Sequence, residues 1–186
     1  MNKKLVAALS GGAVLVLALS GCSDDGSEVD AYAKKVCDDA QPQLKKITQA
    51  NRAIKDTAAD GKPKDIKKTD SAAFQQISDG YAALSDSVEK AGTPPVDNGA
   101  QIQKDAVKEL DATSKAYAEL KQQSDKLDIK TRGAFADGLK KLIVDIDRVN
   151  EVGNAAIKKL QSGEIGTAMA KQSSCQRSAK APSAAS

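Results

Sequence analysis

The chain has 186 residues, with 28 lysines and arginines against 25 aspartates and glutamates, three cysteines, no histidine and no tryptophan. The absence of histidine excludes His-dependent catalytic triads, His-ligated zinc and the His-containing di-iron bundles. Three cysteines are too few for a four-thiolate zinc site or a four-cysteine iron–sulfur cluster. Few classes of enzyme or metalloprotein therefore stay open, and the sequence predicts no catalytic, cofactor-binding or metal-binding residue.

The first 21 residues have the layout of a secretory signal peptide. Lys3 and Lys4 form a short basic head, and residues 5–19 are apolar or small and carry no charge. A stretch of this length is too short to span a bilayer comfortably. We therefore expect residues 1–21 to be cleaved during export.

The end of this apolar stretch resembles the lipobox of bacterial lipoproteins. Leu19, Ser20, Gly21 and Cys22 match its pattern of a leucine, two small residues and a cysteine. In that family a diacylglyceryl group is attached to the cysteine thiol, and the signal is cut before it. The resemblance implies acylation of Cys22, by palmitate or related chains, and anchoring on the extracytoplasmic face of the cell membrane. A chance cysteine beside an ordinary cleavage site is the alternative.

Loss of the signal peptide also changes the charge of the chain. It removes Lys3 and Lys4, so the mature chain carries 26 cationic side chains against 25 carboxylates, a net formal charge of +1. A charge so close to zero gives no general attraction to nucleic acid or to anionic lipid. No nucleic-acid partner is predicted.

Two cysteines remain once Cys22 carries lipid. Cys37 and Cys175 would lie in a compartment that permits disulfides, and an even remainder of two predicts one bridge. The bridge would join the first predicted helix to the last, which in the chain-entropy account contributes about 5 kcal/mol. Two unpaired thiols are the alternative. A redox-active pair is disfavoured because the two cysteines lack the Cys-x-x-Cys spacing.

The mature chain divides into three parts. Residues 22–28 are predicted to be the lipidated cysteine and a short polar tether, residues 29–176 a helical domain, and residues 177–186 a disordered tail. Within the domain, apolar residues recur three and four positions apart, which is typical of helices. Pro42 lies inside the first helix, expected at about 28–60, and should kink or break it.

Glycine, proline and capping residues predict the helix boundaries. Breaks are expected at residues 61–63 and 92–95, where glycine and proline cluster. Asp97 or Asn98 would cap the third helix, and Thr131 would cap the fourth. The fourth helix, which ends at Gly163, carries the widest apolar face and is expected to be the most buried. A short fifth helix is expected at about 164–176.

These elements predict an all-α, up-and-down four-helix bundle, with the short fifth helix stapled to the first by the disulfide. No segment alternates apolar and polar residues for long, so no strand is predicted. The three-and-four spacing suits antiparallel helices that cross at about 20°. An extended helical hairpin is the alternative. All five aromatic residues fall on the apolar stripes and are predicted to pack in the core: Tyr32, Phe74, Tyr81, Tyr117 and Phe135.

Two groups of charged residues could be taken for sites. Asp145 and Asp147 lie two apart on a helix, so their carboxylates should not converge, and Lys141 is the expected ion-pair partner of Asp145. A second group, of lysines interrupted by acidic residues, is predicted to be a solvated face that could also meet lipid headgroups: Lys62, Lys64, Lys67 and Lys68, with Asp65 and Asp70.

The whole layout resembles the small secreted lipoproteins of actinobacteria. These chains combine a lipobox, a short polar tether, a helical domain rich in Ala, Lys and Asp, and a cysteine pair. The resemblance implies display at the cell surface and carries no established chemistry.

The functional prediction is a membrane-anchored, non-enzymatic interaction module that contacts an envelope protein or the cell wall. The alternative is a carrier or sensor that binds a small apolar ligand between helices. The space for that ligand would be left by Gly138 and Gly153, beside Tyr117 and Phe135.

Overall fold

The computed structural model of the chain describes residues 24–152 and 155–179. The predicted signal peptide, Cys22, Gly153 and residues 180–186 of the predicted tail lie outside the described residues. The described part is helical and contains no strand, which confirms the all-α class. Its seven helices are α1 (Asp24–Asp60), α2 (Pro63–Ala91), α3 (Gly99–Asp125), α4 (Arg132–Val152), α5 (Ala155–Leu160), α6 (Gly163–Lys171) and α7 (Ser173–Ala179).

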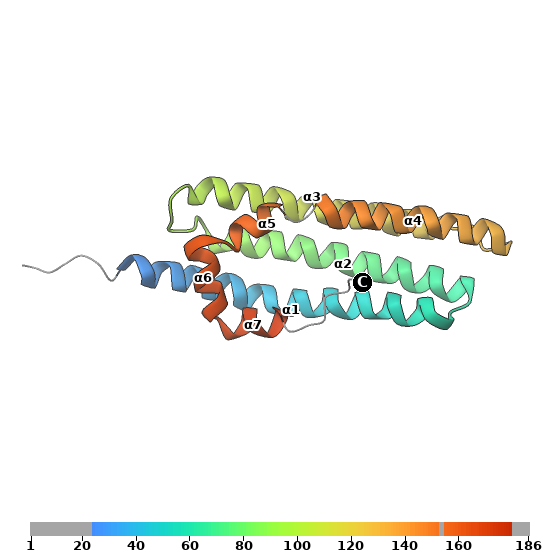
Figure 1. Cartoon of the computed structure of the whole chain (residues 1–186), viewed down its shortest axis with the longest axis horizontal. Helices are drawn as coiled ribbons and strands as arrows, with labels where there is room; N and C mark the ends of the chain where they lie inside the picture. The colour runs from blue at the N-terminus through green and yellow to red at the C-terminus, as the bar shows by residue number, and fades with distance from the viewer. Residues whose placement is uncertain (1–23, 153–154, 180–186) are drawn as a thin grey trace, which may run out of the picture.

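The helices form an elongated molecule built on three antiparallel rods (Figure 1). α2 lies between α1 and α3 and packs on both. α4 returns along α3, α5 packs on α3 as well, and α6 and α7 pack on α1. One end of the molecule holds the start of α1 and the turn between α2 and α3, and the opposite end holds the α1–α2 and α3–α4 turns.

The way α4 packs leaves the predicted closed four-helix bundle unconfirmed. Among the described residues, α4 makes its main contact with α3, and no comparable contact joins it to α1. The space beside α1 that a fourth rod would fill is occupied near one end by α6 and α7. α6 and α7 therefore cover part of α1, which the sequence predicts to be covered by the long fourth helix.

Both ends of the predicted domain differ from expectation. α1 begins at Asp24, so residues 24–28, predicted as tether, are helical. Val29 and Tyr32 are buried, and Lys171 of α6 forms an ion pair with Asp30 at 3.4 Å. These tertiary contacts support the first turns of α1. Residues 177–179, predicted as tail, complete α7, whose position is fixed by the bridge at Cys175.

α1 runs through Pro42 without a break, so the interruption that Pro42 predicted is absent. Pro42 lies on the exposed face of the helix, where water can satisfy the carbonyl that loses its partner. Ala40 and Ile47, on either side, are buried against the rest of the molecule. Packing of these residues outweighs the local cost of the proline, because most helix stability in proteins comes from tertiary contact.

The prediction that the fourth helix is the most buried is wrong. On α4 the side chains of Ile143 and Val144 are 54% and 56% exposed. Residues 153 and 154, between α4 and α5, lie outside the described residues, and α5 ends at Leu160, close to the end predicted at Gly163. The predicted fifth helix is divided at Gln172, whose ψ of 122° is extended. An apolar face wider than the neighbouring helix can cover leaves residues at its margin in solvent.

α2 is the central helix, and it uses small residues to approach both neighbours. A Cβ atom on Gly80 would lie 2.7 Å from Cγ1 of Ile47, so glycine is what lets α1 come this close. Toward α3, serines seven residues apart form cross-helix hydrogen bonds: Ser71 to Asp125 (2.5 Å), Ser78 to the carbonyl of Ser114 (2.8 Å) and Ser85 to the carbonyl of Val107 (3.4 Å). This serine seam was not recognised in the sequence.

The predicted caps behave differently from each other. The hydroxyl of Thr131 accepts a hydrogen bond from the amide of Ala134 at 3.2 Å, which confirms it as a side-chain cap of α4. Asn98 is the N-cap of α3, but its side chain makes no capping bond. Asn98 instead has a left-handed backbone (φ 59°), and its carbonyl accepts from Gln101 and Ile102 at 3.0 Å. Asparagine tolerates this conformation better than most residues.

Candidate functional site

The disulfide between Cys37 and Cys175 is present as predicted. The two Cα atoms are 5.1 Å apart and the sulfurs 2.03 Å apart. α1 places Cys37 in the core, where it is 1% exposed, and α7 brings Cys175 across from a position 138 residues later in the chain. The bridge fixes the C-terminal helices to the first half of α1.

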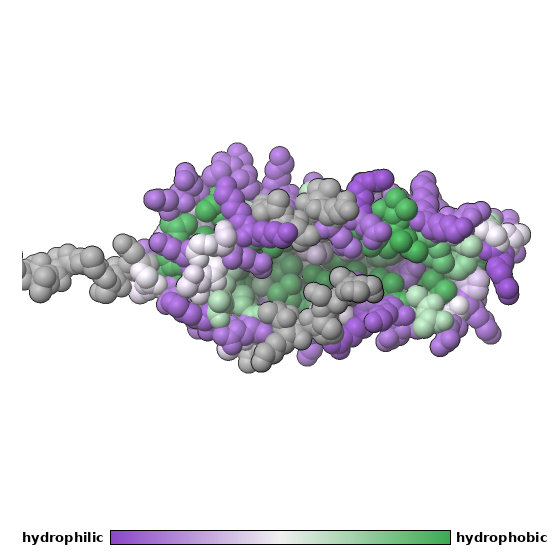
Figure 2. All heavy atoms as spheres, in the orientation of Figure 1, coloured by the Kyte–Doolittle hydropathy of each residue, from purple (hydrophilic) through white to green (hydrophobic). Residues whose placement is uncertain are grey.

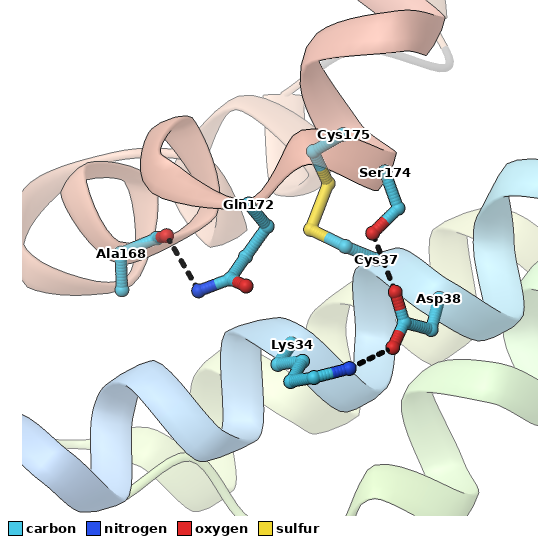
Figure 3. A network of polar contacts seen from close by, with 7 residues as sticks. All are labelled: Lys34, Cys37, Asp38, Ala168, Gln172, Ser174 and Cys175. Carbon is cyan, nitrogen blue, oxygen red and sulfur yellow. Dashed lines mark hydrogen bonds and ion pairs between the residues drawn. A yellow bond between two sulfur atoms is a disulfide. The ribbon is translucent and has the colours of Figure 1, made fainter.

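Polar contacts surround this bridge (Figure 3). The hydroxyl of Ser174 donates to the carboxylate of Asp38 at 2.5 Å, and Lys34 forms an ion pair with the same carboxylate. The side-chain amide of Gln172 donates to the carbonyl of Ala168 at 3.4 Å, at the junction between α6 and α7. Ser174 is buried, so its hydrogen bond offsets the cost of removing the hydroxyl from water.

The chemistry of this region is that of a structural staple. Cys37 is almost fully buried and lies in the apolar core with Val36 and Ala40. Cys37 therefore presents almost no sulfur surface to a thiol in solution, whereas Cys175 is half-buried. Cys22, the predicted site of lipid attachment, lies outside the described residues.

The aromatic residues lie in the core as predicted, with Tyr81 half-buried and the other four buried. The rings of Tyr81 and Tyr117 are stacked with centroids 5.7 Å apart, and Phe74 lies 6.2 Å from Tyr117. The hydroxyl of Tyr117 donates to the side-chain oxygen of Asn150 at 3.2 Å. Burial raises the pKa of Tyr117 to about 12, so this hydroxyl stays protonated at physiological pH.

Asp70 is a buried carboxyl that the sequence reasoning placed on a solvated face. Its side chain is 5% exposed, and Oδ1 has no hydrogen-bond partner among the described residues. Burial raises the pKa of Asp70 to about 6, because a charged carboxylate is poorly solvated there. The signal was present in the sequence, since Asp70 is spaced four and seven residues from Ile66 and Ile77, on the buried stripe of α2.

Asp145 and Asp147 do not converge on a common site. Asp145 pairs with Arg148 at 2.8 Å, not with Lys141 as predicted. Asp147 is exposed. In the described part of the chain, no group of three or more Cys, Asp or Glu side chains is arranged to hold a metal ion.

Two surface cavities mix charged or polar residues with apolar ones in their lining, and no aromatic residue lines either of them. One of about 350 Å³ lies between α3 and α4, and charged side chains including Glu109, Glu119 and Arg148 line it. Another, of about 990 Å³, lies between the α2–α3 turn and the start of α6, and turn residues line much of it. Small-molecule pockets are mostly lined by apolar and aromatic side chains.

The space that the carrier hypothesis placed beside Gly138 is filled. A Cβ atom on Gly138 would lie 2.7 Å from Cδ2 of Leu127, so the Leu127 side chain already occupies that position. The second glycine, Gly153, lies outside the described residues. A ligand would reach the position beside Gly138 only if the Leu127 side chain moved.

The lysines singled out in the sequence lie at the end of the molecule that holds the α1–α2 turn. Lys62, Lys64 and Lys68 are exposed, whereas Lys67 is half-buried and donates to the carbonyl of Leu127 at 2.9 Å. Lys67 thus ties the start of α2 to the α3–α4 turn. The structure brings together two groups of cations that lie some sixty residues apart in the chain.

None of the helices in residues 24–152 and 155–179 combines the length and the apolar character needed to cross a bilayer. A comparison of the chain with protein-family models found no match, and comparisons with curated proteins and with solved structures found none either.

Proposed function

We propose that this protein is an extracytoplasmic lipoprotein, anchored through Cys22, that acts as a non-enzymatic interaction module at the cell envelope. The observation that carries the proposal is that two of the three cysteines form a disulfide and one is left over. Cys37 and Cys175 are joined to each other, which suits an exported protein, because structural disulfides are rare in reducing compartments. Cys22 is then the cysteine left for acylation, and it stands at the end of the lipobox-like sequence.

The start of α1 supports a short link to the membrane. α1 begins at Asp24, directly after the proposed acylated residue and Ser23. Two or more acyl chains would hold the protein firmly, since each buried methylene contributes about 0.8 kcal/mol. A helix that starts so close to the anchor would hold the bundle near the lipid surface at one end. We also propose that the protein is related to the small secreted lipoproteins of actinobacteria, which it resembles in layout.

The four-helix arrangement is a further part of the proposal. α4 carries apolar side chains, including Ile143, that α3 does not cover. We place α4 as the fourth rod of the bundle, with this margin of its apolar face turned toward the groove beside α1. Figure 2 shows hydrophobic residues gathered along the middle of this face of the molecule, between hydrophilic rims.

The anchoring proposal is tested by replacing Cys22. Cells that express the natural chain or the Cys22→Ala variant are separated into membrane and soluble fractions, and the intact mass of the product is measured. We expect the natural chain in the membrane fraction, with a mass that begins at Cys22 and includes a diacylglyceryl group. A Ser23→Ala variant is the matched control and should fractionate like the natural chain. A soluble natural chain without acyl mass would overturn the proposal.

The interaction part is tested separately by lysine-directed crosslinking in living cells. We expect one or a few specific adducts that involve an envelope protein or cell-wall polymer and that are reproducible between preparations. Crosslinking that repeatedly gives no specific adduct contradicts an interaction module, whatever the result for Cys22.

A further inference from the structure

The end of the molecule opposite the start of α1 concentrates positive charge. We define the distal tip as residues 60–68 and 126–132, which form the α1–α2 and α3–α4 turns with the adjoining helix ends. The distal tip contains three carboxylates, Asp60, Asp65 and Asp128, and seven cations: Lys62, Lys64, Lys67, Lys68, Lys126, Lys130 and Arg132. Its net charge is +4, so the remainder of the +1 mature chain sums to −3.

Specific contacts hold the two halves of the distal tip together. Lys67 donates to the carbonyl of Leu127 at 2.9 Å, and the hydroxyl of the fully buried Ser124 donates to the carbonyl of Lys67 at 3.2 Å. Ser71 donates to Asp125 at 2.5 Å just below the turns. The charged turns therefore sit on a fixed base rather than on separate loops.

Apart from the half-buried Lys67, the cations of the distal tip are available to a partner. Lys62, Lys64, Lys126 and Lys130 are exposed, and none of the ion pairs within the described residues involves a cation of the distal tip. The basic side chains in those pairs lie elsewhere on the molecule. Unpaired cations of one sign at one end of a rod create a field that attracts anions.

The composition of the distal tip indicates what kind of anion it suits. It contains no aromatic residue and no methionine, and Ile129, 40% exposed, is its one largely exposed apolar side chain. Protein–protein interfaces are enriched in aromatic residues, methionine and arginine and depleted of lysine. Stacking platforms for single-stranded nucleic acid also need aromatic rings. Lysine ammonium groups on flexible stems act as point charges toward phosphates and do not require one fixed geometry.

We propose that the distal tip binds a flexible polyanionic polymer of the cell envelope with phosphodiester groups in its repeat unit, and that Lys62, Lys64, Lys126 and Lys130 make the contacts. This inference rests on the proposed function for its location, since anchoring at Cys22 directs the distal tip away from the membrane. α1 has 37 residues and therefore spans about 55 Å between the two ends. That length lets a lipid-anchored rod reach a polymer that lies outside the lipid headgroups.

The test measures binding of poly(glycerol phosphate) to the whole chain, purified from whichever cell fraction holds it, over a series of salt concentrations. The tip variant replaces Lys62, Lys64, Lys126 and Lys130 with glutamine. The control variant replaces Lys45, Lys46, Lys108 and Lys115 with glutamine as well. These lysines are exposed along the sides of α1 and α3, so the control loses the same total charge as the tip variant. Circular dichroism and thermal unfolding establish that both variants fold like the natural chain.

We expect the natural chain to bind with an affinity that falls as salt rises. The tip variant should lose about tenfold or more in affinity at low salt. Its salt dependence should be shallower by about 3 in slope, since four phosphate contacts are lost at about 0.7 each. The control variant should stay within about twofold of the natural chain. Equal losses in the two variants would show a net-charge effect and overturn the proposal, as would no binding at low salt.

Phosphatidylglycerol vesicles and poly-glutamate separate the other sources of anionic charge. Vesicle binding that depends on the tip lysines and exceeds polymer binding would assign the distal tip to lipid headgroups and overturn the polymer proposal. Equal or tighter binding of poly-glutamate would assign it to acidic protein segments. The polymer is soluble, and the protein is purified from whichever cell fraction contains it. The binding results therefore do not depend on whether Cys22 is acylated.

Discussion

At the scale of single residues, Asp70 is a carboxyl in an unfavourable environment. It is buried on the apolar stripe of α2, and Oδ1 lacks a hydrogen-bond partner among the described residues. A folded-state pKa of about 6 lies above the ordinary aspartate pKa of 3.8, so the folded protein binds a proton more tightly than the unfolded chain. Asp70 therefore lowers stability above pH 6, and this effect fades below pH 4.

We expect Asp70→Asn to stabilise the protein at neutral pH. A pKa difference of about two corresponds to up to about 3 kcal/mol, since the amide removes the buried charge while keeping the shape. The gain should shrink toward zero at pH 4, where the native carboxyl is already protonated. Urea unfolding at pH 4 and pH 7 measures both values. The exposed Asp111→Asn is the control. An equal gain for Asp70→Asn at both pH values contradicts this account.

Two glycines in helices test how closely α1 and α2 pack. A Cβ atom on Gly80 would lie 2.7 Å from Cγ1 of Ile47, whereas a Cβ atom on Gly133 would meet no heavy atom of another segment within 4 Å. Alanine raises helix propensity at either site by about 1 kcal/mol at most. The free energies of unfolding of the two alanine variants should therefore differ by about 1–3 kcal/mol, with Gly80→Ala the less stable. Equal stabilities would mean that Ile47 moves aside without cost.

At the scale of helices, the disulfide decides where the C-terminal segment lies. α6 and α7 are short, and helices of this length are not stable by themselves in water. They are held by Ile165 and Met169 in the core, by the Lys171–Asp30 ion pair and by the bridge at Cys175. The first half of α1, with Val29 and Tyr32, is buried partly through this cover.

We expect the double variant Cys37→Ala, Cys175→Ala to lose about 2–5 kcal/mol of stability, because the bridge closes a long loop in the unfolded chain. Hydrogen exchange should rise in α6, in α7 and in residues 29–40 of α1, while residues 47–58 keep their protection. Chemical denaturation and hydrogen-exchange mass spectrometry measure the two effects. Uniformly faster exchange along the whole of α1 would show that the bridge stabilises the molecule globally and does not fix one segment.

At the scale of the whole molecule, the two ends have different surroundings if Cys22 carries the anchor. Thr93 lies in the α2–α3 turn, at the end where α1 begins, and Lys130 lies in the distal tip. The length of α1, about 55 Å, separates these ends. One end would therefore lie near lipid and the other well beyond the headgroups.

A fluorophore attached to an introduced cysteine can measure this orientation. In membranes that contain a headgroup-bound quencher, we expect strong quenching for Thr93→Cys and little for Lys130→Cys. The native bridge consumes Cys37 and Cys175, so labelling goes to the introduced thiol. Equal quenching at both sites would show a rod that lies along the membrane, and would contradict the upright orientation on which the distal tip proposal rests.

The sequence by itself determined the local features of this fold. The three-and-four spacing located the long helices, because that spacing is the period of the helix itself. Glycine and proline marked the turns at residues 61–63 and 92–95, and the aromatic residues were assigned to the core from their places on apolar stripes. The disulfide was predictable because only Cys37 and Cys175 remained once Cys22 was assigned to lipid.

Only the tertiary structure decided which partner covers each apolar face. Periodicity shows that Ile143 belongs to an apolar margin, but whether that margin is buried depends on a neighbour far away in the chain. The same reason explains the uninterrupted helix at Pro42 and the burial of Asp70. The distal tip likewise exists because Lys67 meets Leu127, a contact between residues sixty apart that no local pattern encodes.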